Sequence, residues 1–363
     1  MTEFRLGEFF CGPGGLALGA LTSDVPGMNI SHAWATDYDR STCDTYIRNI
    51  CPENPDSVIC NDIRTLDFEK LRALGEIDGF AFGFPCNDYS TVGEQKGMAG
   101  NYGPLYAYGV KALKLFQPKW FLAENVSGLN SANDGDSFKQ ILRELKECGY
   151  RVCSHLYKFE EYGLPQARHR IIIVGIRNDL NLNFLVPSPE GYKLKTSKEA
   201  IEVPPIAPDA FNHEKTKQSE RVVERLKHIK AGENAFTAQL PAHLKLNVKG
   251  ATISQIYRRL DPNRPAYTVT GSGGGGTHMY HWAEPRALTN RERARLQTFP
   301  DTYQFCGTKE SVRKQIGMAV PPEGARIIFE AILKTFAGIE YPSLQDSVVQ
   351  SIKLEDTYDL FEL

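Results

Sequence analysis

Phe9–Gly15, with the sequence FFCGPGG, is the stretch that decides the fold. It follows a short predicted strand and precedes LALGAL, which is predicted to be helical. Glycines at such a turn let the backbone pass close to a nucleotide-like ligand. A plain tight turn has the same composition, so the turn needs support from residues elsewhere. Its spacing is not the GxGxxG that favours NAD.

Strands and helices alternate over the first ~175 residues. A helix is predicted over 137–150, where apolar residues recur at helical spacing and Gly149 ends the pattern. Buried strands are predicted at the apolar runs 30–35, 79–84, 120–123 and 171–174. This alternation predicts an α/β fold whose mostly parallel sheet has helices on both faces. Ligands of such sheets bind at the carboxyl ends of strands, where we expect Asp37, Cys86 and Glu124.

The pattern changes after Gly175. Residues 178–285 hold many prolines, one candidate helix at 221–229 and the run GSGGGG at 271–276. Helices return at Thr289, which forms a predicted capping box with Glu292, and a last helix is expected from Pro322 to Lys334. We therefore predict two domains. Residues 1–177 and 286–363 form the first, and residues 178–285 form a smaller, irregular second domain.

Charge, hydrophobicity and cysteine content permit nucleic-acid binding and argue against a membrane protein, a metal site and a disulfide framework. The net charge is −2, yet 178–285 carries 14 Lys and Arg against 11 Asp and Glu, which permits nucleic acid there. No apolar run approaches the roughly 18 residues that span a bilayer, so no membrane association is expected. The eight cysteines include no CxxC pair. Neither a metal site nor a disulfide framework is expected, and the predicted location is the reducing cytoplasm.

Several side chains at the predicted strand ends could carry chemistry. Asp37 suits the two hydroxyls of a ribose, and Asp62 could accept from an adenine amino group, although either acid could simply cap a helix. Cys86 follows Pro85 on a strand-end loop, where a cysteine is better placed as a nucleophile than in a core. Glu124 adds a carboxyl group at the next strand end. Arg168 and Arg170 are expected to alternate on one strand face, and surface salt bridges are the alternative for each.

Taken together, these segments resemble the DNA (cytosine-5)-methyltransferase family of bacterial or phage type, over nearly the whole chain. The motifs occur in the family's order: FxGxGG (10–15), Pro-Cys (85–86), Glu-Asn-Val (124–126), QxRxR (166–170), RExxRLQxFPD (291–301) and GxAVPP (317–322). The resemblance implies a Rossmann-like class I methyltransferase fold. It also implies that 178–285 is a target-recognition domain.

The resemblance further implies S-adenosylmethionine as the cofactor, with S-adenosylhomocysteine as the product. Its expected contacts come from the turn, the strand ends and the closing motif: Phe10, Gly12, Pro13, Gly14, Gly15, Asp37, Tyr38, Asp62, Ile63, Leu105, Met318, Ala319 and Val320. The expected catalytic residues are Cys86, Glu124, Arg168 and Arg170. The family carries glutamine where this chain has Asn87, which puts a backbone contact near the nucleophile in doubt. It carries asparagine where this chain has Met318, which removes a polar side chain from the cofactor end of the pocket.

The chemistry of cytosine explains why the family needs these residues. Attack of the Cys86 thiolate on carbon 6 turns the ring into an enamine that can accept a methyl group at carbon 5. Glu124 would stabilise the ring at N3, Arg170 would hold O2, and Arg168 would support the site or a phosphate. The base must leave the helical stack first, and the loop 90–103, rich in glycine, would close over it.

The expected partner is double-stranded DNA, and a monomer is expected. Thr268, Gly273, Gly274 and Gly275 resemble the family's recognition loop. Gln255 is a candidate for filling the gap that the flipped base leaves in the duplex, and Arg258 is a candidate for reading a guanine. Gln255 as a solvated loop residue is the alternative. A cognate restriction endonuclease is a candidate partner. Three rival functions remain open at this point: a tRNA cytosine-5-methyltransferase on the same scaffold, a DNA-binding relative without catalysis, and a nicotinamide oxidoreductase.

Overall fold

The computed structural model describes residues 1–84, 105–126, 136–246 and 255–344. These residues form two compact units. One comprises residues up to 158, residues 169–190 and residues from 322 onward, and the other comprises 159–168 and 191–321. The chain therefore passes from one unit to the other four times. Contacts group 286–321 with 191–285, whereas the sequence interpretation had joined that stretch to the N-terminal part.

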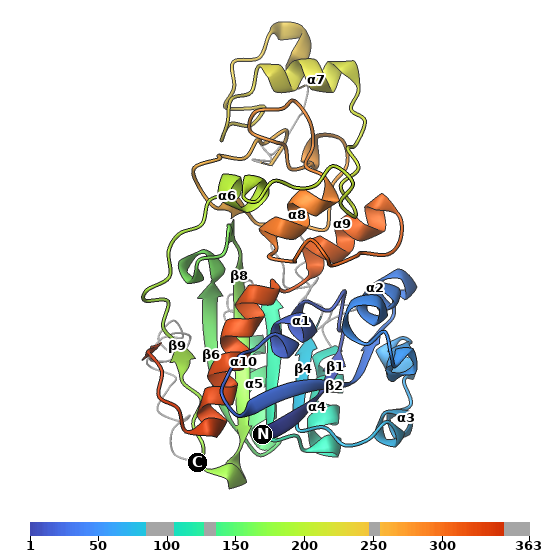
Figure 1. Ribbon diagram of the computed structural model, residues 1–363, viewed down its shortest axis with the longest axis vertical. Coiled ribbons are helices and arrows are strands. Elements are labelled where there is room, and N and C mark those ends of the chain that lie inside the picture. Colours follow the sequence, from blue (N-terminus) through green and yellow to red (C-terminus); the bar gives the residue numbers. More distant parts are fainter. Residues whose placement is uncertain (85–104, 127–135, 247–254, 345–363) are drawn as a thin grey trace. The chain divides into compact units, whose positions relative to one another are not determined.

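A seven-stranded sheet organises the first unit, in the order β3-β2-β1-β4-β5-β8-β6 (Figure 1). The strands from β3 to β5 pair in parallel, and β8 pairs antiparallel with both β5 and β6. The strands are β1 (Thr2–Phe9), β2 (Met28–Asp37), β3 (Val58–Cys60), β4 (Gly79–Gly83), β5 (Trp120–Val126), β6 (Tyr150–Lys158) and β8 (His169–Arg177). The predicted mostly parallel α/β sheet is confirmed.

Alternating side chains along the strands send apolar groups to both faces of this sheet. Trp34 belongs to a core that includes residues of α3 (Phe68–Ala73), α4 (Tyr106–Phe116) and α5 (Asp136–Glu147), whereas its neighbour Ala35 belongs to a second core with residues of α2 (Arg40–Ile50). On that second face α1 (Gly15–Leu21) contacts α10 (Pro322–Ala337), and Figure 1 shows the two helices side by side. A Cβ added to Gly19 would lie 2.6 Å from the Pro322 carbonyl oxygen, so this contact requires glycine.

Short elements complete the first unit. A two-stranded antiparallel pair joins β9 (Val186–Pro187) to β11 (Ser343–Leu344). The 3-10 helices are η1 (Pro55–Ser57), η2 (Ile63–Thr65) and η7 (Asn178–Leu180). No helix in the described ranges is long and apolar enough to cross a membrane.

Helices of at most ten residues and a two-stranded pair build the described part of the second unit. Its helices are α6 (Ser197–Glu202), α7 (Glu220–Lys227), α8 (Asn290–Leu296) and α9 (Lys309–Met318), with 3-10 helices η6 (Phe159–Tyr162), η8 (Ala242–Leu244) and η9 (Gly275–Thr277). The strands β7 (Gln166–Ala167) and β10 (Ala266–Tyr267) pair in parallel. Thr289 caps α8 in the predicted capping box with Glu292. A separate core forms around Leu226, Tyr257 and Tyr280.

Candidate active site

The glycine-rich turn joins β1 to α1 as the sequence predicted. Gly12 and Gly14 adopt φ angles of 55° and 89°, a left-handed conformation that glycine takes without strain. A Cβ added to Gly12 would meet nothing within 4 Å, so the surface of the turn is open there. The Gly12 N–H donates to the Asp37 carboxylate over 3.0 Å. The turn and the acid at the end of β2 therefore form one site, although 25 residues separate them in the chain.

Asp37 is held in place by backbone donors. Its second carboxylate oxygen accepts from the Asp39 N–H over 3.0 Å. Burial raises the pKa of Asp37, and these two backbone hydrogen bonds oppose the rise. Asp39, rather than Asp37, caps α2. Tyr38 comes next along the chain with its side chain 63% exposed, which leaves an aromatic surface beside the acid.

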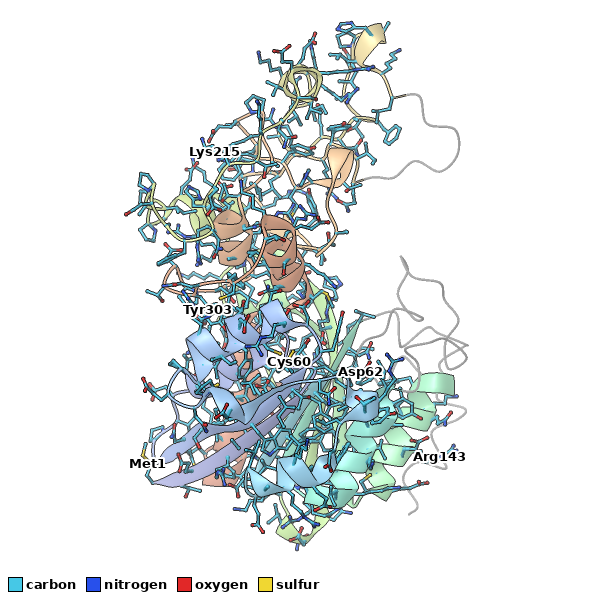
Figure 2. All side chains as sticks on the ribbon, turned by 90° about the vertical axis from the view of Figure 1, so that its right-hand side faces the viewer. Met1, Cys60, Asp62, Arg143, Lys215 and Tyr303 are labelled. Atoms are coloured by element: carbon cyan, nitrogen blue, oxygen red, sulfur yellow. The ribbon has the colours of Figure 1, made fainter. Side chains whose placement is uncertain are left out.

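The end of β3 reaches the same edge of the sheet, because the Asn61 N–H donates to the Asp37 carbonyl over 2.9 Å. Asp62 caps η2 and forms a 2.6 Å ion pair with Arg64, whose hydrogen bonds lower the pKa of Asp62 to about 2. Cys60 and Asp62 are labelled in Figure 2. The capping alternative for Asp62 thus occurs in the structure. Ile63 and Leu105 are buried, and Phe10 packs against the sheet's core.

Glu124 and Arg170 form a largely buried ion pair in the first unit. They project from the neighbouring strands β5 and β8, with 2.8 Å between Arg170 Nε and the nearer Glu124 oxygen, and each side chain is only 14% exposed. Burial lowers the pKa of Arg170, and Glu124 opposes that effect. β5 continues to Val126, so Glu124 lies within the strand and not at its end. Glycine at position 83 leaves room for the other Glu124 oxygen, which a Cβ there would approach to 3.2 Å.

The residue before the Pro-Cys motif is anchored to the same strand. The Asn125 side-chain amide is buried and donates to the Phe84 carbonyl over 3.3 Å. Pro85, Cys86 and Asn87, as well as the loop 90–103, lie outside the described residues. The described chain reaches Phe84, one residue beyond β4, whose last residue Gly83 pairs with Glu124.

Arg168 and Arg170 do not share a strand face, so that expectation was wrong. Arg168 lies between β7 and β8, because the chain bends where its N–H bonds the Gln166 carbonyl. Its guanidinium is buried and donates to the Val269 carbonyl over 3.1 Å. This contact gives Arg168 a structural role inside the second unit.

A glutamine that the sequence reasoning quoted without a role organises the second unit. Gln166 is buried, accepts from the Val269 N–H over 2.7 Å, and donates to the Gln297 side chain over 2.8 Å. Gln297 in turn donates to the carbonyls of Ile316 and Ala319. Three of the six sequence motifs, together with the segment that carries Thr268, are thereby connected through two side-chain amides.

The predicted recognition residues lie near one another in the second unit. Thr268 donates its hydroxyl to the Ala167 carbonyl over 2.7 Å, and the Arg258 guanidinium stacks on the Tyr267 ring, 4.5 Å from its centre. The Gln255 side-chain oxygen is buried and has no hydrogen-bond partner. The loop with Gly273, Gly274 and Gly275 is exposed at Gly274. Met318 is 60% exposed at the end of α9, whereas Ala319 and Val320 are buried.

Residues 4–334 match the family of C-5 cytosine-specific DNA methylases. The chain belongs to this family. It is a DNA (cytosine-5)-methyltransferase, an enzyme of a family that takes its methyl group from S-adenosylmethionine.

Curated relatives agree with the family match. The methyltransferase is 61% identical to the Type II methyltransferase M.BbvI of Brevibacillus brevis, with 94% of each chain covered. It is 38% identical to M.NgoFVII of Neisseria gonorrhoeae, covering 94% of this chain and 90% of that one. A crystal structure of an Escherichia coli prophage chain described as a DNA modification methyltransferase gives a TM-score of 0.72 at 24% identity, covering 92% of this chain and 99% of that one. That likeness supports the fold.

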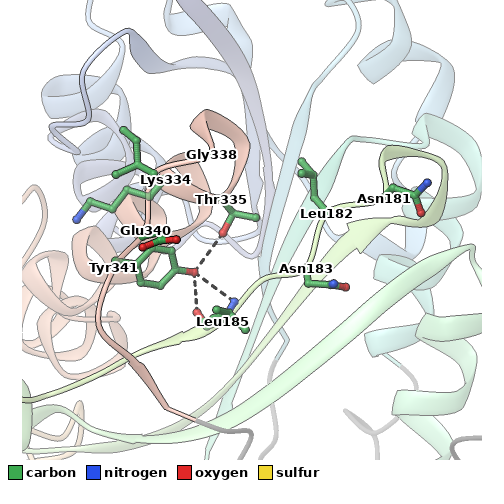
Figure 3. A pocket seen from close by; sticks show the side chains of 10 residues that line it. Asn181, Leu182, Asn183, Leu185, Lys334, Thr335, Gly338, Glu340 and Tyr341 are labelled. Atoms are coloured by element: carbon green, nitrogen blue, oxygen red, sulfur yellow. Dashed lines mark hydrogen bonds between the residues drawn. The ribbon is translucent and has the colours of Figure 1, made fainter.

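Two surface pockets of the methyltransferase lie away from these residues. One, of about 420 Å³, is lined by Asn181–Asn183 and the end of α10, where the Tyr341 hydroxyl bonds Thr335 and the Leu185 backbone (Figure 3). The other lies beside His32 and Pro52. Neither is lined by a predicted site residue. Among the described residues, no group of His, Cys, Asp and Glu is arranged to hold a metal ion.

Sequence reasoning missed a buried acid directly beneath the glycine turn. Glu8 is fully buried in β1, and burial raises its pKa to about 8. The Tyr46 hydroxyl donates to one Glu8 oxygen over 2.5 Å. The two ring nitrogens of His32 form hydrogen bonds with Tyr46 and Ser57. An acid within the apolar run of β1 was the signal that could have revealed it.

Proposed function

We propose that this methyltransferase modifies a cytosine turned out of duplex DNA, with Cys86 as the covalent nucleophile. The single observation that carries the proposal is the Glu124–Arg170 ion pair. Asn125, the residue after Glu124 on β5, donates a hydrogen bond to the Phe84 carbonyl. Cys86 follows Phe84 by two residues, so the nucleophile and the pair start from the same edge of the sheet.

The open glycine turn and the fixed acid fit an adenosine ligand. Gly12 and Gly14 allow close approach of the ligand, and Asp37 has both oxygens oriented by backbone N–H groups. We assign Asp37 to the ribose, the exposed Tyr38 ring to the adenine face, and Ile63 and Leu105 to apolar walls. S-adenosylmethionine supplies an electrophilic methyl group when bound. Pro13, Met318, Ala319 and Val320 remain assigned from the sequence pattern.

The reaction steps follow from the residues of the chain. The Cys86 sulfur bonds carbon 6 of cytosine and thereby makes carbon 5 nucleophilic. Glu124 donates a hydrogen bond or proton at N3, while Arg170 keeps the carboxyl group oriented and contacts O2. After methylation a solvent base takes the carbon-5 proton, the electrons of that C–H bond restore the C5–C6 double bond, the carbon–sulfur bond breaks with Cys86 leaving as a thiolate, and any proton given to N3 returns to Glu124.

The decisive experiment measures transfer of a radiolabelled methyl group to duplex DNA. Cys86→Ala should abolish transfer, whereas Glu124→Gln should lower the rate about 10²- to 10⁴-fold with DNA binding retained. A duplex with 5-fluorocytosine should trap the wild-type chain covalently, because fluorine cannot leave as a proton. Turnover by Cys86→Ala at the wild-type rate would refute the proposal.

Further partners are proposed from the same activity. A restriction endonuclease that cuts the DNA sequence methylated here would be its functional partner, as the Type II names of the relatives suggest. We propose that the enzyme acts as a monomer on DNA in the bacterial cytoplasm.

A further inference from the structure

Two arginines of the second unit lie against the glycine-rich loop without the partners that buried arginines normally have. Arg293, on α8, is 1% exposed. One of its terminal nitrogens donates to the Thr270 carbonyl over a long 3.4 Å, and the other is buried without a partner. Burial lowers the pKa of Arg293 to about 10, which reflects how poorly this site solvates the charge.

Other buried arginines of the same unit provide an internal comparison. Arg291 donates to the carbonyls of Phe211, Pro300 and Tyr303, all within 3.0 Å. Arg259 donates to four carbonyls, at 2.7 to 3.1 Å. These two side chains satisfy the backbone and serve the fold. Arg293, two residues from Arg291, does not follow that pattern.

Arg313 brings a second positive charge to the same place. It projects from α9, its side chain is 14% exposed, and its Nε is buried without a partner. A Cβ added to Gly273 would lie 3.0 Å from this Nε and 3.4 Å from His278 Nδ1, so the loop passes directly over both groups. Arg293 and Arg313 also lower the pKa of His278, which burial takes to about 4, so all three groups are near one another.

The acids near this cluster do not neutralise it. Glu310 reaches Arg313 only at 3.6 Å and is 85% exposed. Glu292 raises the pKa of Arg293, but its carboxylate already accepts two hydrogen bonds from Arg286, of 2.7 and 2.8 Å. Besides burial, Arg313 lowers the pKa of Arg293, so two largely buried cations lie close together against an exposed loop. Buried charge without a partner is costly, so an arrangement of this kind is expected where an anion binds.

We propose that Arg293, Arg313 and the loop Gly271–Gly274 form a binding site for a phosphodiester group of the DNA backbone. The inference rests on the proposed function, and it adds a contact that holds DNA regardless of base sequence. The Arg313 guanidinium, which is partly exposed, contacts the phosphate, and Arg293 adds charge from beneath the loop. Glycine suits the loop because the backbone can then approach the phosphate closely.

The test is the salt dependence of duplex binding by the full chain. Arg313→Gln should weaken binding about 10- to 100-fold for matched and mismatched duplexes alike. It should also reduce the slope of log K against log salt by about 0.9, the value for one lost phosphate contact. Arg313→Lys should keep most of the slope. The matched control is Lys314→Gln, which removes an exposed charge from the next residue of α9 and should change the slope less.

Arg293→Gln provides a second variant in case the first perturbs α9. It should weaken DNA binding yet leave the melting temperature of the free protein unchanged or raised, because the wild-type guanidinium makes only one long hydrogen bond. Arg291→Gln, by contrast, should lower the melting temperature. A wild-type slope in both Arg313→Gln and Arg293→Gln, in an enzyme that still methylates DNA, overturns this inference and leaves the proposed function standing. Wild-type protein that binds no duplex overturns both.

Discussion

Glu8→Gln tests whether a protonated acid lies in β1 next to the glycine-rich turn. The Tyr46 hydroxyl donates to one Glu8 oxygen, while the other Glu8 oxygen is buried without a hydrogen-bond partner, so this site solvates an ionised carboxylate poorly. His32 lies between Tyr46 and Ser57, at 3.1 and 2.8 Å, and Ser57 donates to the Asn54 carbonyl. Glutamine is nearly isosteric with the protonated acid and cannot ionise. The variant should therefore fold normally, and its unfolding free energy should lack the pH dependence that the titration of Glu8 causes.

The magnitude follows from the pKa of Glu8. Folding raises it from 4.5 to about 8, so between these values the folded state binds a proton that the unfolded state has lost. The stabilisation is complete below pH 4.5 and is lost as pH rises toward 8. Each pH unit in the middle of this window costs about 1.4 kcal/mol, and because titration is only partial near both ends the total between pH 5 and pH 8 is about 3.5 kcal/mol.

The assay is urea unfolding of the wild type and of Glu8→Gln at pH 5, 6.5 and 8. The difference in unfolding free energy between the two proteins should shift by about 3.5 kcal/mol in favour of the variant from pH 5 to pH 8. Groups that titrate equally in both proteins cancel in this difference. A difference that stays constant across the three pH values would refute the reasoning, because Glu8 would then be ionised in the fold or unshifted.

Three further perturbations test other contacts. Asp37→Asn should weaken S-adenosylmethionine binding by about tenfold or more in calorimetry, since the amide cannot accept from both the Gly12 N–H and a ribose hydroxyl with the same strength; unchanged affinity removes Asp37 from the cofactor site. Gly19→Ala should lower unfolding free energy by about 1–3 kcal/mol through the clash with Pro322, while Gly274→Ala, with no atom within 4 Å, should be neutral. Arg170→Ala should cost about 3–5 kcal/mol of stability by leaving the Glu124 carboxylate buried alone, and the additional change Glu124→Gln should recover part of it, which a double-mutant cycle measures.

Local patterns explain what the sequence could predict. The β-branched run Ile171–Val174 lies inside β8, and the Thr289–Glu292 pair caps α8 as expected, because both signals depend on residues close in the chain. The partners of Arg168 could not be predicted in this way. Its acceptor is the carbonyl of Val269, 101 residues away, so an alternating pattern suggested a strand face that the fold does not contain.

The site was predictable where motif residues meet at strand ends. Gly12 and Asp37 were expected in one site, and a hydrogen bond joins them. Glu8 and Arg293 were missed because their meaning depends on what surrounds them. The acid within the apolar run of β1 was visible in the sequence, but the burial that raises its pKa was not, and neither was the buried, unpartnered nitrogen of Arg293 on α8.

The four passages of the chain between its two compact units limit how the second unit can be exchanged between relatives. A graft of residues 191–321 alone would leave the short segment 159–168 behind on the host. The graft would then place Val269 and Gln297 against a foreign residue at position 166, where Gln166 now satisfies both. A chimaera must therefore carry the two pieces together, and natural drift in one of them should be matched by compensating changes in the other.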